Sequence, residues 1–133
     1  MPQPDAVKSM AQAYTVAWNS GDPHKVASFY AEGAGIIINN GDPHMGNDAM
    51  VAMAAGFFAA VPDLELTCDE LRVAGDHAVF VWTFTGHDSE TKNPLNVHGW
   101  EEWDLTETPH IKASRGWFDA DDYARQIAGD APQ

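Results

Sequence analysis

Most of the residues that could do chemistry lie in one stretch, from Val79 to Asp119. Three runs rich in Val, Phe, Trp and Thr fill this stretch, separated by a polar loop at 88–94 and a turn at 106–109. Such runs predict strands joined as an antiparallel meander. The polar side chains that interrupt them are the best candidates for acid/base or binding chemistry: His87, His98, Glu101, Arg115 and Asp119.

Glu101 is the most informative of these residues, because Trp100 and Trp103 flank it in the sequence. A carboxyl group in an apolar pocket has its pKa raised, so it can stay neutral near pH 7 and donate a hydrogen bond. The alternative is a strand glutamate that faces solvent.

Strand alternation narrows this choice. If Glu101 points inward, Gly99 and Trp103 point inward too, whereas His98 and its alternate neighbours Trp100 and Glu102 point outward. Without a bulge, His98 and Glu101 therefore cannot both line one pocket.

Length and charge limit the function classes. The 133 residues predict a single domain, 1–133, that is large enough to bury a core. Twenty acidic and seven basic residues give a net charge of −13, which disfavours nucleic acid and anionic membranes as partners. A single cysteine, Cys68, and the lack of a signal peptide or apolar span predict a cytoplasmic protein.

Metals and cofactors find no support in the residue pattern. The six histidines, at 24, 44, 77, 87, 98 and 110, form no H-x-H or H-x-x-E-H cluster. No glycine-rich phosphate loop and no Gly-x-Ser-x-Gly elbow is present. We therefore expect neither a metal site nor a cofactor.

The elements that would position these residues begin with helices. Helical spacing predicts a helix from Pro4 that ends near Gly21, and Asp22-Pro23 predicts the start of a second. After these helices we expect a brief strand at 35–39, a turn at 40–43, a helix capped by Asn47 or Asp48, and strands at 64–73 and 79–87. The last short helix starts around Asp119, and 130–133 are expected to form a frayed tail. Helices first and consecutive strands later indicate an α+β fold.

Several motifs resemble known enzymes. YTVAWNSGDPHKVASFYA, at 14–31, resembles the opening of the ketosteroid isomerases. Thr85-Gly86-His87 is similar to SnoaL-like polyketide cyclases, as is Pro-Asp-Leu at 62–64. GWFDADDY, at 116–123, is similar to the end of the limonene epoxide hydrolases. All three families belong to the nuclear transport factor 2-like superfamily.

This resemblance implies a cone: a strongly curved antiparallel sheet wrapped by the N-terminal helices, usually as a homodimer, with a deep pocket inside. Superfamily members include isomerases, cyclases and hydrolases but also non-catalytic binders, so the fold does not decide the function. In such a cone the helices fill the inward sheet face only in part, so aromatic side chains wall a cavity for a flat hydrophobic ligand. The expected substrate-binding residues are Trp18, Phe29, Asn40, Phe57, Phe58, Trp82, Phe84, Trp103 and Phe118, although such a set is also typical of an ordinary core.

The resemblance to the isomerases also implies catalytic roles. Tyr14 and Glu101 match the positions of two hydrogen-bond donors to a developing enolate oxygen. Tyr14 could equally be a core tyrosine. Ile38 occupies the position of the proton-shuttling Asp, and an isoleucine cannot shuttle protons.

Other proton shuttles are possible. The cyclase resemblance points to Asp119, whose alternative role is the N-cap of the last helix, and to His87, which could equally be solvated. His44 lies before the third helix, near where pocket groups occur in this fold. The epoxide hydrolases' essential Asp corresponds to Gly116, and their Arg-x-Asp pair is absent from 79–84.

Two hypotheses follow. The first is a cofactor-independent acid/base enzyme of isomerase, cyclase or lyase type, acting on a small hydrophobic enolisable substrate. Tyr14 and Glu101 would stabilise the oxyanion, and His44, His87 or Asp119 would move the proton. The second is a non-catalytic small-molecule-binding or dimeric accessory domain that keeps the pocket and has lost the base.

Overall fold

The first two helices begin and end where proline and glycine allow. In the computed structural model, which describes residues 1–129, α1 spans Pro4–Ser20 and α2 spans Pro23–Ala27. Gly21 ends α1 in the left-handed conformation, with φ 72°. Asp22 caps α2 by accepting a hydrogen bond from the backbone N–H of His24 at 2.9 Å. Both boundaries confirm the predicted ones.

Six strands form one sheet in the order β2-β1-β6-β5-β4-β3. The strands are β1 Gly35–Ile38, β2 Pro43–Met45, β3 Glu65–Ala74, β4 His77–His87, β5 Pro94–Leu105 and β6 Ile111–Phe118. Strands β3 to β6 form the predicted antiparallel meander. However, β1 pairs with β6 in parallel, so the sheet is mixed rather than wholly antiparallel. The chain leaving α2 runs alongside β6 in the same direction, as the parallel bridge between Tyr30 and Ile111 shows.

The segment between β1 and α3 differs in detail from the prediction. Asn39 and Asn40 both have positive φ, 51° and 58°, and reverse the chain. This reversal pairs β2 with β1, where only a turn was predicted. Helix α3 spans Asn47–Ala60 with Gly46 as its N-cap, one residue before the earlier of the two predicted caps.

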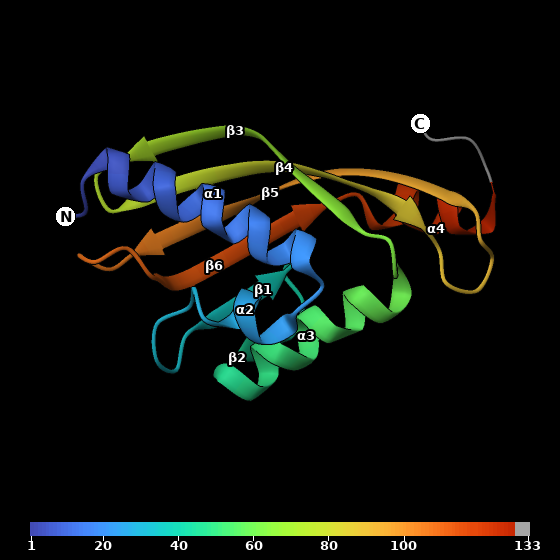
Figure 1. Cartoon of the computed structure of the whole chain (residues 1–133), viewed down its shortest axis with the longest axis horizontal. Helices are drawn as coiled ribbons and strands as arrows, with labels where there is room; N and C mark the ends of the chain where they lie inside the picture. Colours follow the sequence, from blue (N-terminus) through green and yellow to red (C-terminus); the bar gives the residue numbers. More distant parts are fainter. Residues whose placement is uncertain (130–133) are drawn as a thin grey trace.

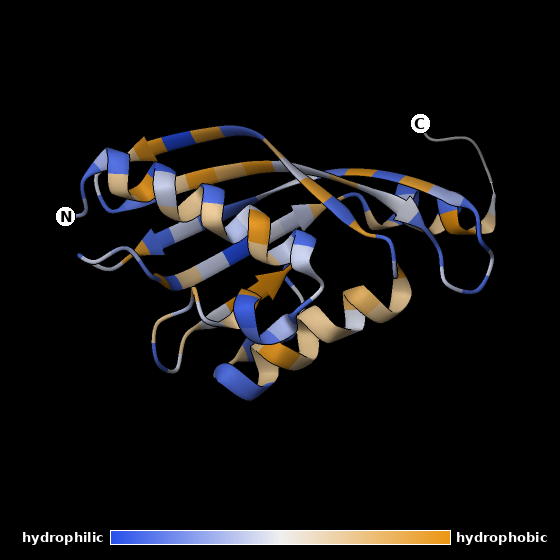
Figure 2. Cartoon of the chain, viewed as in Figure 1, coloured by the Kyte–Doolittle hydropathy of each residue, from blue (hydrophilic) through white to orange (hydrophobic). Residues whose placement is uncertain are grey.

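The helices lie in a layer against the sheet, except for α4. In Figure 1, α1 lies across the long strands, whereas α2 and α3 lie beside the short strands β1 and β2. Helix α4, Ala120–Ala128, packs at the far end of β5. Figure 2 shows that α3 is apolar over most of its length, in contrast to the two-sided α1. This arrangement confirms the predicted α+β fold.

Burial alternates along the two central strands, which confirms the predicted faces. On β4, Phe80, Trp82 and Phe84 are all buried on the face that the helices cover. On β5, Glu101 and its alternate neighbours Gly99 and Trp103 are buried, whereas His98 and Trp100 are exposed. One face of the sheet is therefore apolar and enclosed, and the other is exposed.

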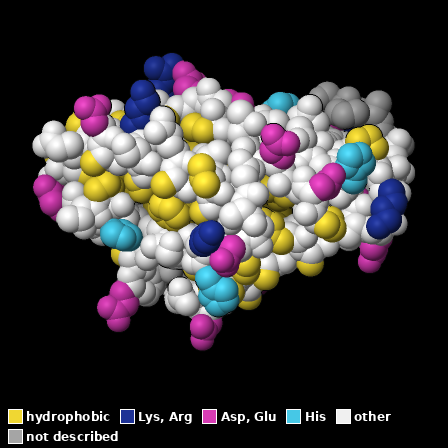
Figure 3. All heavy atoms as spheres, in the orientation of Figure 1, with side chains coloured by type: hydrophobic (Ala, Val, Ile, Leu, Met, Phe, Trp, Pro, Cys, Tyr) yellow, Lys and Arg dark blue, Asp and Glu magenta, His cyan; other side chains and the backbone are white. Residues whose placement is uncertain are grey.

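The surface is predominantly acidic, as the composition requires. On the face shown in Figure 3, acidic side chains are scattered over the middle of the face and along its rim, and the Lys and Arg side chains drawn there form no continuous patch. Each helix in residues 1–129 is too short or too polar to cross a bilayer. The expected frayed tail, 130–133, lies outside the described residues.

Candidate functional site

Glu101 lies at the centre of a buried hydrogen-bond network. Its Oε1 accepts one hydrogen bond from the Tyr14 hydroxyl and one from the indole Nε1 of Trp103, each at 3.0 Å. The Tyr14 hydroxyl has a single proton, which it donates to Glu101, so it accepts from the Tyr30 hydroxyl at 3.0 Å. Both bonds to the carboxyl end on Oε1. Ser114 and Tyr30 also lie near the carboxyl group and favour its charged form, as Trp103 and Tyr14 do.

Burial sets the protonation of this group. Desolvation raises the pKa of Glu101, and the hydrogen bonds from Trp103 and Tyr14 oppose that rise because they favour the carboxylate. Burial also raises the pKa of Tyr14 well above its ordinary value, and the neighbouring Glu101 raises it further. Tyr14 is therefore a neutral hydrogen-bond donor, and the exchangeable proton of this network belongs to Glu101.

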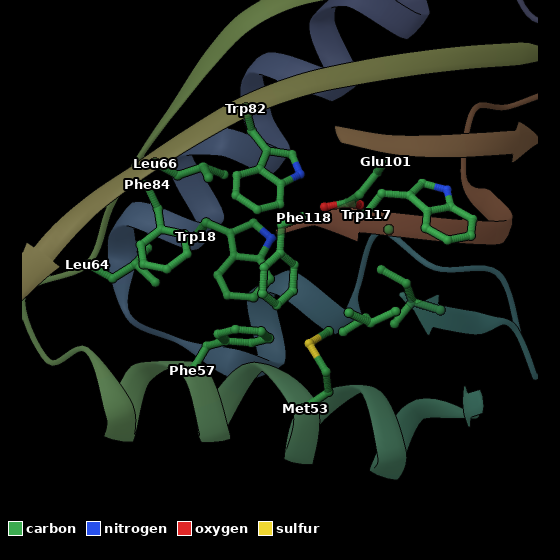
Figure 4. A pocket seen from close by; sticks show the side chains of 13 residues that line it. Trp18, Met53, Phe57, Leu64, Leu66, Trp82, Phe84, Glu101, Trp117 and Phe118 are labelled. Carbon is green, nitrogen blue, oxygen red and sulfur yellow. The ribbon is translucent and has the colours of Figure 1, made fainter. Parts of the chain in front are cut away.

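A narrow apolar pocket opens beside the carboxyl group. It is formed by α1, β1, α3, the start of β3, and strands β4 to β6 (Figure 4). Its lining residues are Trp18, Ile36, Ile38, Met53, Phe57, Leu64, Leu66, Trp82, Phe84, Glu101, Gly116, Trp117 and Phe118. Glu101 is the one ionisable side chain in this lining, which is drawn from residues 1–129. The pocket thus isolates a single carboxyl group among rings and aliphatic side chains.

Two glycines make room for this arrangement. Gly116 pairs with Glu101 across β5 and β6, and a Cβ there would lie 3.7 Å from Cγ of the glutamate. Gly99 lies under Trp82, where a Cβ would come within 2.5 Å of Cζ2 of the indole. A side chain at either position would crowd Glu101 or Trp82. Both glycines therefore allow neighbouring groups to approach the backbone closely, rather than forming turns.

The structure brings together some of the predicted substrate-binding residues but not all. Trp18, Phe57, Trp82, Phe84 and Phe118 line the pocket. The other aromatic candidates lie in the packing behind it: Phe29 and Trp103 contact the ring of Tyr14, and Phe58 packs against Trp18. Asn40 is exposed in the turn before β2.

Three candidate proton shuttles lie outside the lining. His87 is exposed, with its Nδ1 2.6 Å from Oδ2 of Asp63. Asp119 caps α4 by accepting a hydrogen bond from the backbone N–H of Asp122 at 3.0 Å. His44 is half-buried on β2, directly across from Ile36. Within residues 1–129, no group of three or more His, Cys, Asp and Glu side chains is placed to hold a metal ion.

Sequence reasoning missed part of the site. Tyr30 completes the network behind Glu101, and its partner Tyr14 is sixteen residues away. The helical spacing of apolar residues predicted which face of α1 is buried. It carries no information about Tyr30, which lies just beyond α2. Ile36, Met53 and Leu66 line the pocket but are chemically indistinguishable from core residues. Only the tertiary structure separates lining from core.

Solved structures share this architecture. TsrD from Streptomyces laurentii is 22% identical, with a TM-score of 0.83 over 96% of this chain and 98% of its own. A protein of ketosteroid isomerase-like fold from Catenulispora acidiphila DSM 44928, solved in complex with trimethylamine, is 18% identical, with a TM-score of 0.81 over 95% and 94%. The epoxide hydrolase/cyclase-like enzyme SalBIII, studied for pyran ring formation in salinomycin, is 16% identical, with a TM-score of 0.81 over 92% and 97%. Identities this low establish the fold alone.

The fold is therefore the ketosteroid isomerase-like fold. A family model described as the SnoaL-like domain matches residues 11–112. The chain therefore belongs to the SnoaL-like domain family, as its motifs suggested. None of the curated proteins compared with the chain matches it.

Proposed function

We propose that this protein is a cofactor-independent acid/base enzyme that acts on a small hydrophobic carbonyl compound. The observation that carries this proposal is the position of Glu101: it is the one ionisable group in the lining of an apolar pocket, and two neutral donors hold it in place. A carboxyl group with a raised pKa can both accept and return a proton near neutral pH.

The proposal gives Tyr14 a different role from the one that the isomerase resemblance implies. Its hydroxyl is fully buried and donates to Glu101, and Tyr14 is not part of the pocket lining. We therefore assign it to positioning the carboxyl group. Glu101 itself moves the proton, because His44, His87 and Asp119 lie outside the lining.

The volume of the pocket limits the substrate. In this conformation it is about 60 Å³. A cavity of about 150 Å³ accommodates a benzene ring, so a ligand with one ring must displace some lining side chains. We therefore propose a substrate of about one ring rather than a polycyclic one.

A minimal test uses 3-cyclohexenone, a one-ring ketone with an acidic C–H between its carbonyl and its double bond. Proton removal and return at the far end of the double bond give 2-cyclohexenone, whose conjugation is followed by ultraviolet absorbance. Deuterium uptake from heavy water, measured by NMR, reports proton removal even without net isomerisation. We expect both to occur in the wild-type protein and to fall by a factor of about 10² to 10⁴ in Glu101→Gln.

The second candidate is a non-catalytic small-molecule-binding domain. Ile38 favours it, because this side chain lines the pocket at the position where the isomerases carry their base. The same experiment separates the two candidates. Binding of 3-cyclohexenone with deuterium uptake equal in wild type and Glu101→Gln would establish the binding domain, and the absence of both binding and uptake would reject a small-ketone site altogether.

We also propose that two copies pair through the exposed face of the sheet. Val81 and Trp117 are both cross-strand neighbours of Trp100, and Trp100 is 42% exposed. Val81 and Trp117 are half-buried, so the exposed apolar side chain of this group is that of Trp100. An exposed tryptophan beside apolar neighbours is a candidate centre for an interface. Light scattering should give twice the monomer mass of 14.5 kDa, and Val81→Lys should restore the monomer mass. A monomeric wild-type protein would contradict this proposal.

A further inference from the structure

Three indole N–H groups of the pocket lining have no hydrogen-bond partner within the described chain, those of Trp18, Trp82 and Trp117. The nitrogen of Trp117 lies on the side of its ring away from Glu101 (Figure 4), so the other two are the ones that concern the pocket. Nε1 of Trp18 and Nε1 of Trp82 are both buried, and neither makes a hydrogen bond within the described chain. Their side chains are 8% and 9% exposed. A buried donor without a partner costs about 1–3 kcal/mol, so native proteins rarely keep one without a reason. Here the lining of a single small pocket contains these two as well as Trp117.

Both indoles are held in place by packing. Trp18 meets Phe57 and Phe58 edge-on, with ring centroids 6.1 and 5.4 Å apart. Trp82 stacks on Phe84 at 6.0 Å and lies over Gly99. Neither ring can therefore turn its N–H to solvent without breaking these contacts.

The two N–H groups face the part of the pocket that contains the carboxyl group. In Figure 4, each indole nitrogen lies on the side of its ring that faces Glu101. The Trp18 indole lies near enough to Tyr14 to lower the pKa of that hydroxyl, against the larger effect of burial. Its geometry is nevertheless not that of a hydrogen bond, so the donor remains available to a ligand.

We propose that the indole N–H groups of Trp18 and Trp82 bind the carbonyl oxygen of the substrate, which leaves Glu101 to act as the base. This inference rests on the proposed function and specifies its substrate class: a small cyclic ketone with an acidic C–H beside the carbonyl. The C–H proton passes to the Glu101 carboxylate, and its electron pair forms the C=C bond of an enolate. The negative charge then rests on the oxygen, between the two donors, until the protonated Glu101 returns the proton to another carbon.

Indole suits this role chemically. It is a donor only and does not ionise in this pH range, so it cannot exchange a proton with the base. Fixed donors aimed at an oxygen that gains negative charge stabilise the transition state without reorganising. The hydroxyl of Tyr14 is already engaged with Glu101, and the indole of Trp103 is too. Among the unpartnered indoles of the lining, Trp18 and Trp82 are the donors whose nitrogens lie on the side of Glu101.

The test compares two ligands of one shape. p-Cresol carries a hydroxyl oxygen where p-xylene carries a methyl group, and both titrations are followed by calorimetry. In Trp18→Phe and Trp82→Phe, we expect the affinity for p-cresol to fall by about tenfold each. The affinity for p-xylene should change by less than about twofold, because no hydrogen bond is lost. Trp100→Phe removes an indole N–H outside the pocket lining, where Nε1 donates to Glu102, and should change neither affinity.

A second replacement separates the N–H from the ring. Benzothienylalanine, introduced at 18 or 82, keeps the size of tryptophan and exchanges the N–H for sulfur. It should weaken p-cresol binding as Phe does while leaving thermal stability unchanged. Equal losses for p-cresol and p-xylene in these variants would overturn the proposal, because the rings would then serve only as walls.

Turnover distinguishes failure of this inference from failure of the proposed function. If wild type isomerises 3-cyclohexenone and both Phe variants isomerise it at the wild-type rate, the inference fails and the function stands. If no variant shows turnover but the preference for p-cresol depends on Trp18 and Trp82, the donors are real and the enzyme proposal fails. The expected result is that the Phe variants lower kcat and leave the pH dependence due to Glu101 in place.

Discussion

Glu101 and Glu102 are consecutive residues of β5, and each accepts a hydrogen bond from an indole two residues away. Trp103 donates to Glu101 at 3.0 Å, and Trp100 donates to Glu102 at 3.1 Å. The two pairs lie on opposite faces of the sheet. Glu101 is 7% exposed and has two buried donors. Glu102 is instead half-exposed, and Nε of Arg115 lies 3.7 Å from its Oε1.

This difference shows that the sheet face, not the residue type or its closest partner, decides what a carboxyl group can do. On the outer face, Glu102 is partly exposed to water and lies beside the guanidinium group of Arg115. On the inner face, the carboxyl group meets rings and neutral donors, and the free energy of ionisation rises with desolvation.

The largest expected effect comes from exchanging each glutamate for its amide. Glu101→Gln should lower the rate of 3-cyclohexenone isomerisation by a factor of about 10² to 10⁴, because the amide can neither accept nor return the proton. Glu102→Gln should leave that rate within about twofold of wild type. Equal losses in the two variants would remove the functional distinction between the faces.

Tyr14→Phe should have the next largest effect. It deletes one of the two hydrogen bonds to Glu101, so we expect a loss of about 1–2 kcal/mol in the free energy of unfolding, measured by urea titration. The lost bond lowers the pKa of Glu101 in wild type, so the midpoint of the pH–rate profile should move to higher pH. An unchanged midpoint with a lower rate would mean that Tyr14 does not act through the carboxyl group.

The pH dependence of stability should also reveal that Glu101, on the inner face, is buried. Because the pKa of Glu101 is raised in the folded state, its protonated form favours folding. The stability of wild type relative to Glu101→Gln should therefore be highest below about pH 4.3, the ordinary pKa of glutamate. It should fall as the pH rises through the raised pKa and then level off. Unfolding in urea across this range measures the difference, and the opposite slope would contradict a buried, desolvated carboxyl group.

The smallest effect is expected on the outer face. Arg115→Gln removes the cation near Glu102, but both side chains are more than a third exposed, so solvent screens their attraction. We expect the free energy of unfolding to change by less than about 0.5 kcal/mol. Trp103→Phe is the inner-face counterpart, because it removes a buried donor, and it should cost more than Arg115→Gln in the same urea titration.

The alternation of β4 and β5 could be predicted from the sequence because it is a local property. Each inward residue places the next one outward, so the environment of Trp103 was predictable once Glu101 was taken to face inward. The sequence also allowed Asp119 to be predicted as a possible N-cap, because a cap is a local feature that involves only the next three residues. Which residues bind or transform a substrate remains a prediction.

Non-local features could not be predicted in this way. The parallel pairing of β1 with β6 joins segments about 80 residues apart, and β2 has only three residues. The contact between Tyr14 and Tyr30 depends on how α1 packs. The unpartnered indoles of Trp18 and Trp82 are visible only when every neighbour has been placed, because an unmade hydrogen bond leaves no pattern in the sequence.

Gly99 has a consequence for how this pocket could diversify. A single added methyl group at this position would meet Cζ2 of Trp82 at 2.5 Å and the backbone oxygen of Trp117 at 2.4 Å. The clash with backbone cannot be relieved by a side-chain rotation, so any replacement disturbs the pairing of β5 with β6 as well as the pocket. Descendants of this chain could therefore adapt to larger or smaller molecules through α3, where Met53 and Phe57 line the pocket with side chains alone. Position 99 would stay glycine, so the sheet side of the pocket would be kept while the side formed by α3 varies.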